Sequence, residues 1–101
     1  MTVGAFAIGR SGPDRLVASG ALSFDTAAEA LRAGIQLMGV APSCTICLAQ
    51  VTEGDSAGLA VLLEWIAAAR ARGAVVKYEH VPAQILAVAR ISDVQDLLTA
   101  E

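Results

Sequence analysis

The sequence predicts an α/β domain in which helices cover a mostly parallel sheet of about four strands. Short β-rich apolar segments alternate with Ala- and Leu-rich segments of helical period. A helix between two strands crosses over the sheet, which makes those strands parallel. The 101 residues suffice for one buried core and are too few for two. We therefore expect a single domain over residues 1–101.

The chain begins with the pattern of a β-hairpin. Val3–Ile8 is short, apolar and contains β-branched residues, and Arg15–Ala18 has a similar character. Between them, residues 10–14 include Ser, Gly, Pro and Asp, which favour turns. The expectation is two antiparallel strands joined by a long loop.

An Ala-rich helix is predicted after the hairpin. Asp25 or Thr26 is expected to cap it, because a side-chain oxygen there accepts from the unpaired amides of the first turn. Gly39 ends this helix and Pro42 prevents its continuation, so a strand is expected over Cys44–Ala49. The predicted inward face of the helix comprises Ala27, Ala30, Leu31, Gly34, Ile35 and Met38.

A second helix is predicted to begin at Asp55-Ser56, after a polar turn over Thr52–Ser56. Its apolar residues recur at helical spacing and form a stripe that should cover the sheet. Gly73 ends the helix after Arg70 and Arg72, whose positive charges suit its negative end. The stripe comprises Leu59, Leu62, Leu63 and Ile66.

The last part of the chain adds a strand and two short helices. Ala74–Tyr78 reads as the strand, Pro82 can open the first helix, and Ser92 or Asp93 can cap the second. The predicted order is therefore ββαβαβαα. Loops beyond the carboxyl ends of strands commonly form the site in such sheets, and the Thr52–Ser56 turn is one of these loops.

Composition and charge exclude several classes of function. Seven basic against ten acidic residues give a formal charge of −3 without any Lys/Arg cluster, which disfavours binding to nucleic acid or to an anionic membrane. Ala33–Thr52 is uncharged, but Gly and Pro interrupt it, so two buried elements are expected and no membrane insertion. Val3–Ile8 is too short for a secretion signal and has no basic segment before it, which favours a cytoplasmic protein. A hydrophobic fraction of 55% indicates that some apolar surface meets a partner.

The candidate catalytic and metal-ligating residues do not form a site. Cys44 and Cys47 match C-x-x-C, but residues three apart on a strand point to opposite faces, so inert thiols are expected. His80 is the only histidine, and with both cysteines it leaves a zinc site one ligand short. No nucleophile motif accompanies His80, and no Lys follows the glycines around Ser56 as in a nucleotide-binding loop. We expect no metal, no cofactor and no enzyme activity.

Ser56 and two residues of the second helix have the best case for a functional role. At a helix start, the Ser56 hydroxyl lies near unpaired amides and the positive end of the helix dipole. It is either an ordinary helix-start group or a phosphate acceptor, with the dipole favouring phosphate and Asp55 opposing it. Val61 and Trp65 fall outside the apolar stripe and are expected to face outward, where Trp65 lies at the margin of the core or contacts a partner.

Several segments of the chain together resemble a known family. Residues 55–63, DSAGLAVLL, resemble the signature of STAS domains, the sulfate-transporter and anti-sigma-factor-antagonist family. Residues 20–26 are similar to the family's segment before its first helix, and residues 81–84 and 86–90 are further matches. The predicted ββαβαβαα order agrees with this family, and the matches cover most of the chain.

Within the family, residues 55–65 and the VPAQ segment look closest to the small cytoplasmic STAS subunits of Mla-type phospholipid ABC transporters. This resemblance implies a non-enzymatic subunit, peripheral to the inner membrane, that binds the transporter's ATPase subunit and through it the permease. It would support assembly and activity for outer-membrane lipid asymmetry. The resemblance implies a partner-binding surface formed by Ser56, Thr52, Asp55, Gly58, Val61, Trp65 and Ser23.

The family also implies an alternative, an anti-sigma factor antagonist. In that case an anti-sigma factor kinase would be the partner, and phosphorylation of Ser56 would switch binding. Ser23 weakens this interpretation, because antagonists commonly carry an acidic residue there. Gly54 is a second departure, since many relatives have an apolar residue at this position.

Overall fold

The computed structural model describes residues 5–99, which form a four-stranded sheet and four helices. The ββαβαβαα order and the α/β fold class are confirmed. In chain order the elements are β1 Phe6–Gly12, β2 Arg15–Leu22, α1 Ala27–Met38, β3 Ser43–Gly54, α2 Ser56–Ala71, β4 Val75–Glu79, α3 Ala83–Ile91 and α4 Gln95–Thr99.

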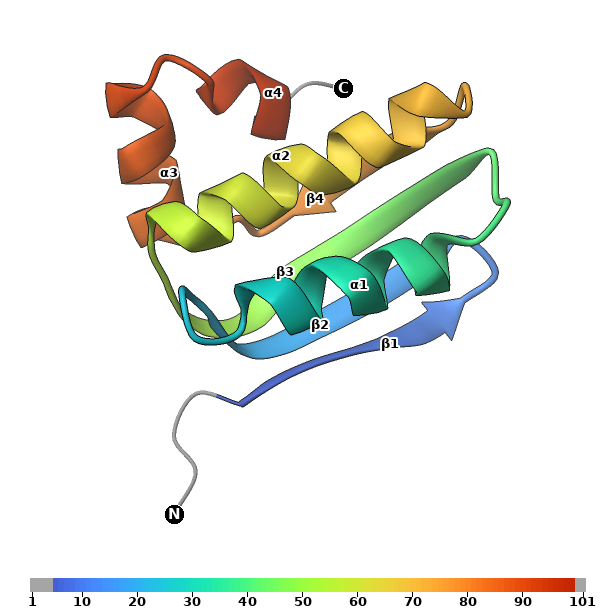
Figure 1. Cartoon of the computed structure of the whole chain (residues 1–101), viewed down its shortest axis with the longest axis horizontal. Helices are drawn as coiled ribbons and strands as arrows, with labels where there is room; N and C mark the ends of the chain where they lie inside the picture. The colour runs from blue at the N-terminus through green and yellow to red at the C-terminus, as the bar shows by residue number, and fades with distance from the viewer. Residues whose placement is uncertain (1–4, 100–101) are drawn as a thin grey trace.

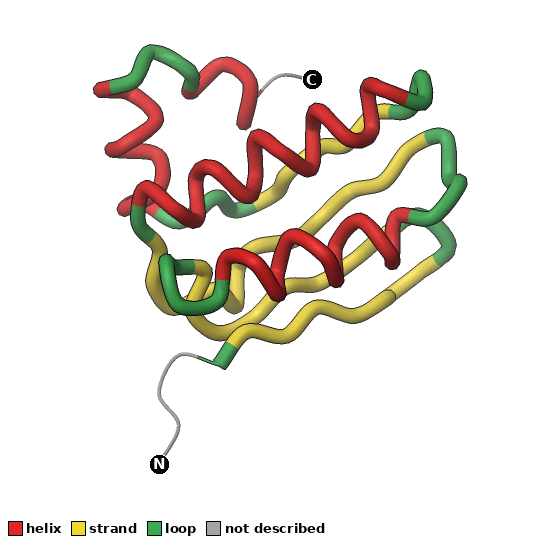
Figure 2. The backbone as a smooth tube through the Cα atoms, viewed as in Figure 1, coloured by secondary structure: helices red, strands yellow, loops and turns green. Residues whose placement is uncertain are grey.

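The sheet has the spatial order β1-β2-β3-β4, with β1 antiparallel to β2 and the other neighbours parallel. Helices α1 and α2 lie side by side in front of the sheet, and α3 and α4 follow beyond α2 (Figures 1 and 2). Helices α1 and α2 each return the chain from the carboxyl end of one parallel strand to the start of the next. Their first turns therefore lie at the same end of the sheet. No helix within residues 5–99 is long and apolar enough to cross a membrane.

The hairpin is tighter than predicted. The expected long loop is wrong, because β1 continues to Gly12 and only Pro13-Asp14 separates the strands, with a register shift between Arg10 and Gly12. β2 extends to Leu22, past Ala18, because it pairs with β1 on one side and β3 on the other. Pairing on both edges thus overrides the weak strand propensity of its Ser and Gly residues. Residues 3–4 of the predicted first strand lie outside the described part.

β3 is also longer than predicted, and this shortens the turn before α2. The strand runs on from Ala49 to Gly54, which is in register with Leu22 of β2. Asp55 alone separates β3 from α2, so the predicted turn over Thr52–Ser56 is wrong. Ile85 of α3 occupies the space beside Gly54, where an added Cβ would come within 2.6 Å of its side chain. The Ile85 side chain therefore fills the space that an apolar residue at position 54 would occupy in many relatives.

Helix α2 is buried on more than its predicted stripe. The expectation that Val61 and Trp65 face outward is wrong, since their exposed fractions are 3% and 0%. The indole Nε1 of Trp65 donates to the Leu31 carbonyl of α1 over 3.2 Å, and Gly34 leaves room for the ring. A Cβ at Gly34 would lie 2.3 Å from the indole. One side of α2 thus covers the sheet while another packs against α1.

Two further sequence expectations about the helices are wrong. Ile35 was placed on the inward face of α1 but is 43% exposed, because the helix turns that side away from both the sheet and α2. Neither Ser92 nor Asp93 caps the last helix, since Ser92 ends α3 and Asp93 has a positive φ in the turn before Gln95. Gly39 and Gly73 end α1 and α2 with positive φ, as predicted.

Candidate partner-binding site

Asp55, and not Ser56, is the capping residue of α2. Its backbone is extended, and its Oδ1 accepts from the amides of Ala57 at 2.9 Å and Gly58 at 3.1 Å. Ser56 is the first residue of the helix and is exposed. The positive end of the helix dipole therefore already faces a carboxylate, which leaves the Ser56 hydroxyl available for other contacts.

The same carboxylate holds the loop between β2 and α1. The Phe24 amide donates to Oδ2 of Asp55 over 3.2 Å. The Thr26 hydroxyl fixes the rest of the loop, since it accepts from the Ser23 amide at 3.0 Å and donates to the Ala21 carbonyl at 2.9 Å. These contacts explain why Thr26, at the N-cap position of α1, makes no side-chain cap. Phe24 itself is 81% exposed.

Gly58 brings the first turn of α2 close to the end of β2. A Cβ at this position would lie 2.1 Å from the Leu22 carbonyl oxygen, which is a backbone atom that cannot move aside. The glycine of the DSAG motif is therefore required for packing between helix and strand. It acts on the site indirectly, by setting where Asp55 and Ser56 lie.

An apolar groove of about 460 Å³ lies between the starts of α1 and α2. We call it the α1–α2 groove. Val61 forms part of its lining although almost none of its surface is exposed, and Glu64 supplies the charged side chain of the lining. The groove is lined by Phe24, Ala27, Ala28, Leu31, Ala57, Ala60, Val61 and Glu64.

The predicted site residues fall into separate groups. Ser56 and Asp55 lie at the groove, beside Ala57 of its lining, and Ser23 lies in the loop that carries Phe24. Thr52 is exposed near the end of β3. Trp65 does not belong to the surface, because its ring closes the contact between α1 and α2.

Phe24 is the functional candidate that sequence reasoning missed. A single aromatic residue in the polar segment Ser23-Phe24-Asp25-Thr26 was the available signal. Large apolar side chains in such turns are costly to expose unless something covers them. Ala27 and Ala57 were missed for a different reason, because small side chains form a groove only once two helices are placed together.

The cysteines and the histidine are not assembled into a site. Cys44 is buried, Cys47 is half-buried, and both are free thiols. Burial raises the pKa of the Cys44 thiol, which keeps it protonated and unreactive. His80 is exposed in the turn after β4. Within residues 5–99, no cluster of three or more His, Cys, Asp or Glu side chains could hold a metal ion.

Comparisons with known proteins agree with this geometry. The family model for the MlaB STAS domain matches residues 8–99. The solved structure of the unphosphorylated anti-sigma factor antagonist SpoIIAA is similar in fold, with a TM-score of 0.71 and 13% identity over 94% of this chain and 86% of that one. The crystal structure of Mglu is also similar, with a TM-score of 0.58 and 26% identity over 79% of this chain but 20% of that one. No curated protein sequence matches the chain.

STAS domains are generally binding and regulatory domains and not enzymes. An exposed hydroxyl, an exposed aromatic side chain and an apolar groove at one end of the sheet suit that role. The chain therefore belongs to the MlaB-like STAS domain family and is a regulatory or accessory protein of that family.

Proposed function

We propose that the protein is the accessory STAS subunit of an Mla-type phospholipid ABC transporter and that it docks on the transporter's ATPase subunit. The match of the MlaB family model to residues 8–99 carries the proposal of this partner class. Through the ATPase the subunit would also associate with the permease, in the cytoplasm and peripheral to the inner membrane. Its role would be to support assembly and activity of the transporter for lipid asymmetry.

The docking surface in this proposal is Ser56 together with the α1–α2 groove. Phe24 offers an exposed aromatic anchor, and the alanines beside it allow a partner's side chain to enter the groove. Ser56 and Glu64 add polar groups at the edge of this apolar area. An apolar centre with a polar rim is the usual anatomy of a protein interface. Asp55 and Gly58 hold this surface in place, while Thr52 and Ser23 flank it.

The test is co-purification of the chain with a candidate ATPase subunit and permease after co-expression. Ser56→Arg should remove the chain from the complex, because a long cationic side chain would stand within the docking surface, at the edge of the apolar groove. Ser11→Arg is the matched control, since Ser11 is exposed near the hairpin turn at the other end of the sheet. A complex that survives Ser56→Arg would refute the docking surface, and failure of the unaltered chain to co-purify would refute the partner.

An anti-sigma factor antagonist is the second candidate, favoured by the exposure of Ser56. Because Asp55 supplies the helix cap, the Ser56 hydroxyl is not needed for it and is accessible to a kinase. The nearby Asp55 carboxylate would oppose the charge of a phosphate there. Incubation with an anti-sigma factor kinase and ATP should add one phosphate by intact mass, and Ser56→Ala should abolish it. An unchanged mass would exclude this candidate for the kinase used.

A further inference from the structure

Strand β4 has one edge without a neighbouring strand in the described sheet. It is last in the order β1-β2-β3-β4, so β3 pairs with one edge only. The Val75 amide donates to the Pro42 carbonyl over 3.1 Å, which directs the backbone groups of Val75 toward the β3 side. Successive residues of a strand direct these groups to alternate sides. The backbone groups of Val76 and Tyr78 therefore point to the free edge.

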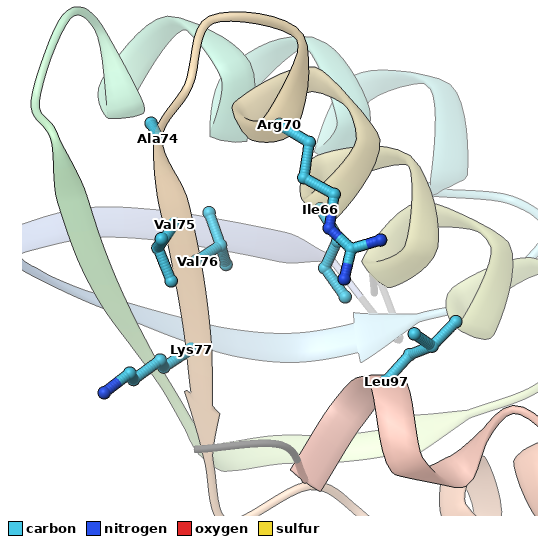
Figure 3. Close-up of a pocket in the computed structure, with 7 residues that line it drawn as sticks. All are labelled: Ile66, Arg70, Ala74, Val75, Val76, Lys77 and Leu97. Carbon is cyan, nitrogen blue, oxygen red and sulfur yellow. The ribbon is translucent and has the colours of Figure 1, made fainter.

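A pocket of about 210 Å³ lies along this edge (Figure 3). Four consecutive residues, 74–77, contribute to its lining, although neighbouring side chains of a strand point to opposite faces. Only a pocket that runs beside the strand can be lined in this way. Ile66 and Arg70 of α2 and Leu97 of α4 complete it, and Leu97 is 41% exposed.

The charged residues of this pocket are both cationic. Arg70 extends from α2 past Ile66 toward Leu97, whereas Lys77 leaves β4 on the side away from them (Figure 3). Within residues 5–99, neither cation is ion-paired with an acidic side chain. Glu79, the acidic residue of β4, is held by Arg15, with 2.5 Å between Oε1 and Nη2. A locally positive edge thus stands on a chain whose formal charge is −3.

This charge pattern distinguishes between the possible occupants of the edge. In a symmetric pair of two copies, the Arg70 and Lys77 side chains of both would meet at the same contact. Like charges across an interface are destabilising, and Lys on an edge strand discourages such self-pairing. A carboxylate-bearing strand would instead pair with both cations.

We propose that the β4 edge binds an extended acidic segment of a partner protein, which adds a fifth strand to the sheet. The backbone groups of Val76 and Tyr78 would pair with this segment, and one of its apolar side chains would enter the pocket between Ile66 and Leu97. Carboxylates on the segment would contact Arg70 and Lys77. This site lies toward the C-terminal end of α2, away from the α1–α2 groove at the start of the helix, and does not depend on the identity of the ATPase partner.

The proposal can be tested by nuclear magnetic resonance with the full chain and the capped peptide Glu-Glu-Val-Glu-Glu, called the Glu peptide. As a strand, this peptide presents Val between two Glu on one face and two further Glu on the other, so carboxylates can reach both Arg70 and Lys77, which leave the pocket on opposite sides of β4. The amide signals of Val76 and Tyr78 should shift and saturate, while those of Ser56 and Ala57 should not. The matched Lys peptide, Lys-Lys-Val-Lys-Lys, should give no such shifts. Added salt should weaken binding of the Glu peptide, because the contacts are exposed charge pairs.

Arg70→Glu combined with Lys77→Glu should weaken peptide binding at least about tenfold. Arg32→Glu combined with Arg90→Glu is the matched control and should bind like the unaltered chain, since both arginines are exposed and neither lines the pocket. Circular dichroism establishes that each variant is folded, and the salt dependence of the unaltered chain tests the charges without any variant. Four results would each overturn the proposal. They are equal binding of the Lys peptide, amide shifts confined to the α1–α2 groove, no binding of the Glu peptide, and a dimer through β4 detected by sedimentation.

Discussion

Helices α1 and α2 meet through two kinds of contact. Midway along the pair, the Trp65 ring fills the space left by Gly34 and its Nε1 donates to Leu31, so the contact is closed. Near the helix starts the side chains are also small, but no large side chain from residues 5–99 fills the space between them, and a groove remains. The alanines concerned are Ala27, Ala28, Ala57 and Ala60. Small residues between helices thus build core only where a larger side chain meets them, and elsewhere they leave room for another protein.

Removal of the closing side chain should have the largest effect. Trp65→Ala should lower the free energy of unfolding by about 3–5 kcal/mol, because it leaves a cavity in the core and removes the indole's hydrogen bond to the Leu31 carbonyl. Urea denaturation monitored by circular dichroism measures this loss. A loss below about 1 kcal/mol, the typical size for any point substitution, would mean that the indole does not close the helix pair.

Gly34→Ala tests the other half of the closed contact. Its Cβ would overlap the buried indole, so we expect a loss of about 1–3 kcal/mol by the same measurement. In the Trp65→Ala background this cost should largely vanish, since the space is then empty. Equal costs in the two backgrounds would show that the glycine is needed for another reason.

Asp55→Ala tests how the first turn of α2 and the Phe24 loop are held at the open end of the helix pair. The two capped amides and the Phe24 amide would lose their acceptor, and the expected loss of stability is about 1 kcal/mol. Asp55→Asn retains an oxygen acceptor and serves as the control, with a smaller loss. Hydrogen exchange at the Phe24 amide should become faster in Asp55→Ala, and an unchanged rate would argue against the link between the loop and α2.

Tyr78→Phe probes the side of α2 that faces β4. The Tyr78 hydroxyl donates to the Leu62 carbonyl over 2.7 Å, and its removal should cost about 1 kcal/mol or slightly less. Burial raises the pKa of Tyr78 well above its ordinary value. Its contribution to stability is therefore complete below about pH 10, the pKa in the unfolded chain, and is lost as the pH rises above it. Stability measured against pH should fall less steeply above pH 10 in Tyr78→Phe, and an equal slope would contradict this assignment.

Phe24→Ala should have the smallest effect on folding. The side chain is 81% exposed, so the free energy of unfolding should change by no more than about 0.5 kcal/mol. Binding to the ATPase subunit should nevertheless be lost in the co-purification experiment. If Phe24→Ala lowered the free energy of unfolding as much as Trp65→Ala does, Phe24 would belong to the core.

The fold was predictable because periodicity and turn residues are local signals. The hairpin, the two crossover helices and the glycines at positions 39 and 73 follow from neighbouring residues alone. The burial of Val61 and Trp65 on α2 was not predicted, because a single apolar stripe assumes that a helix has one buried side. The nearly continuous apolar run from Leu59 to Ala69 was the available sign that α2 is covered on several sides.

The site was only partly predictable, for a related reason. The strand-to-helix junction with Asp55 and Ser56 is visible in the sequence, but which of these neighbours caps the helix depends on side-chain geometry. Phe24 becomes a candidate through its exposed side chain and its place in the lining of the α1–α2 groove, and its amide is held by Asp55, which is thirty-one positions away in the chain. Long-range contacts of this kind leave no periodic pattern.

The Asp55 carboxylate links the two segments at the open end of the helix pair. One oxygen holds the first turn of α2 and the other holds the loop that carries Phe24. A partner that moved the Phe24 loop would have to break the bond between its amide and Asp55, whereas a partner that leaves the loop in place meets a surface whose two sides are already held. Docking at this surface should accordingly require little reordering of the Phe24 loop or of the first turn of α2.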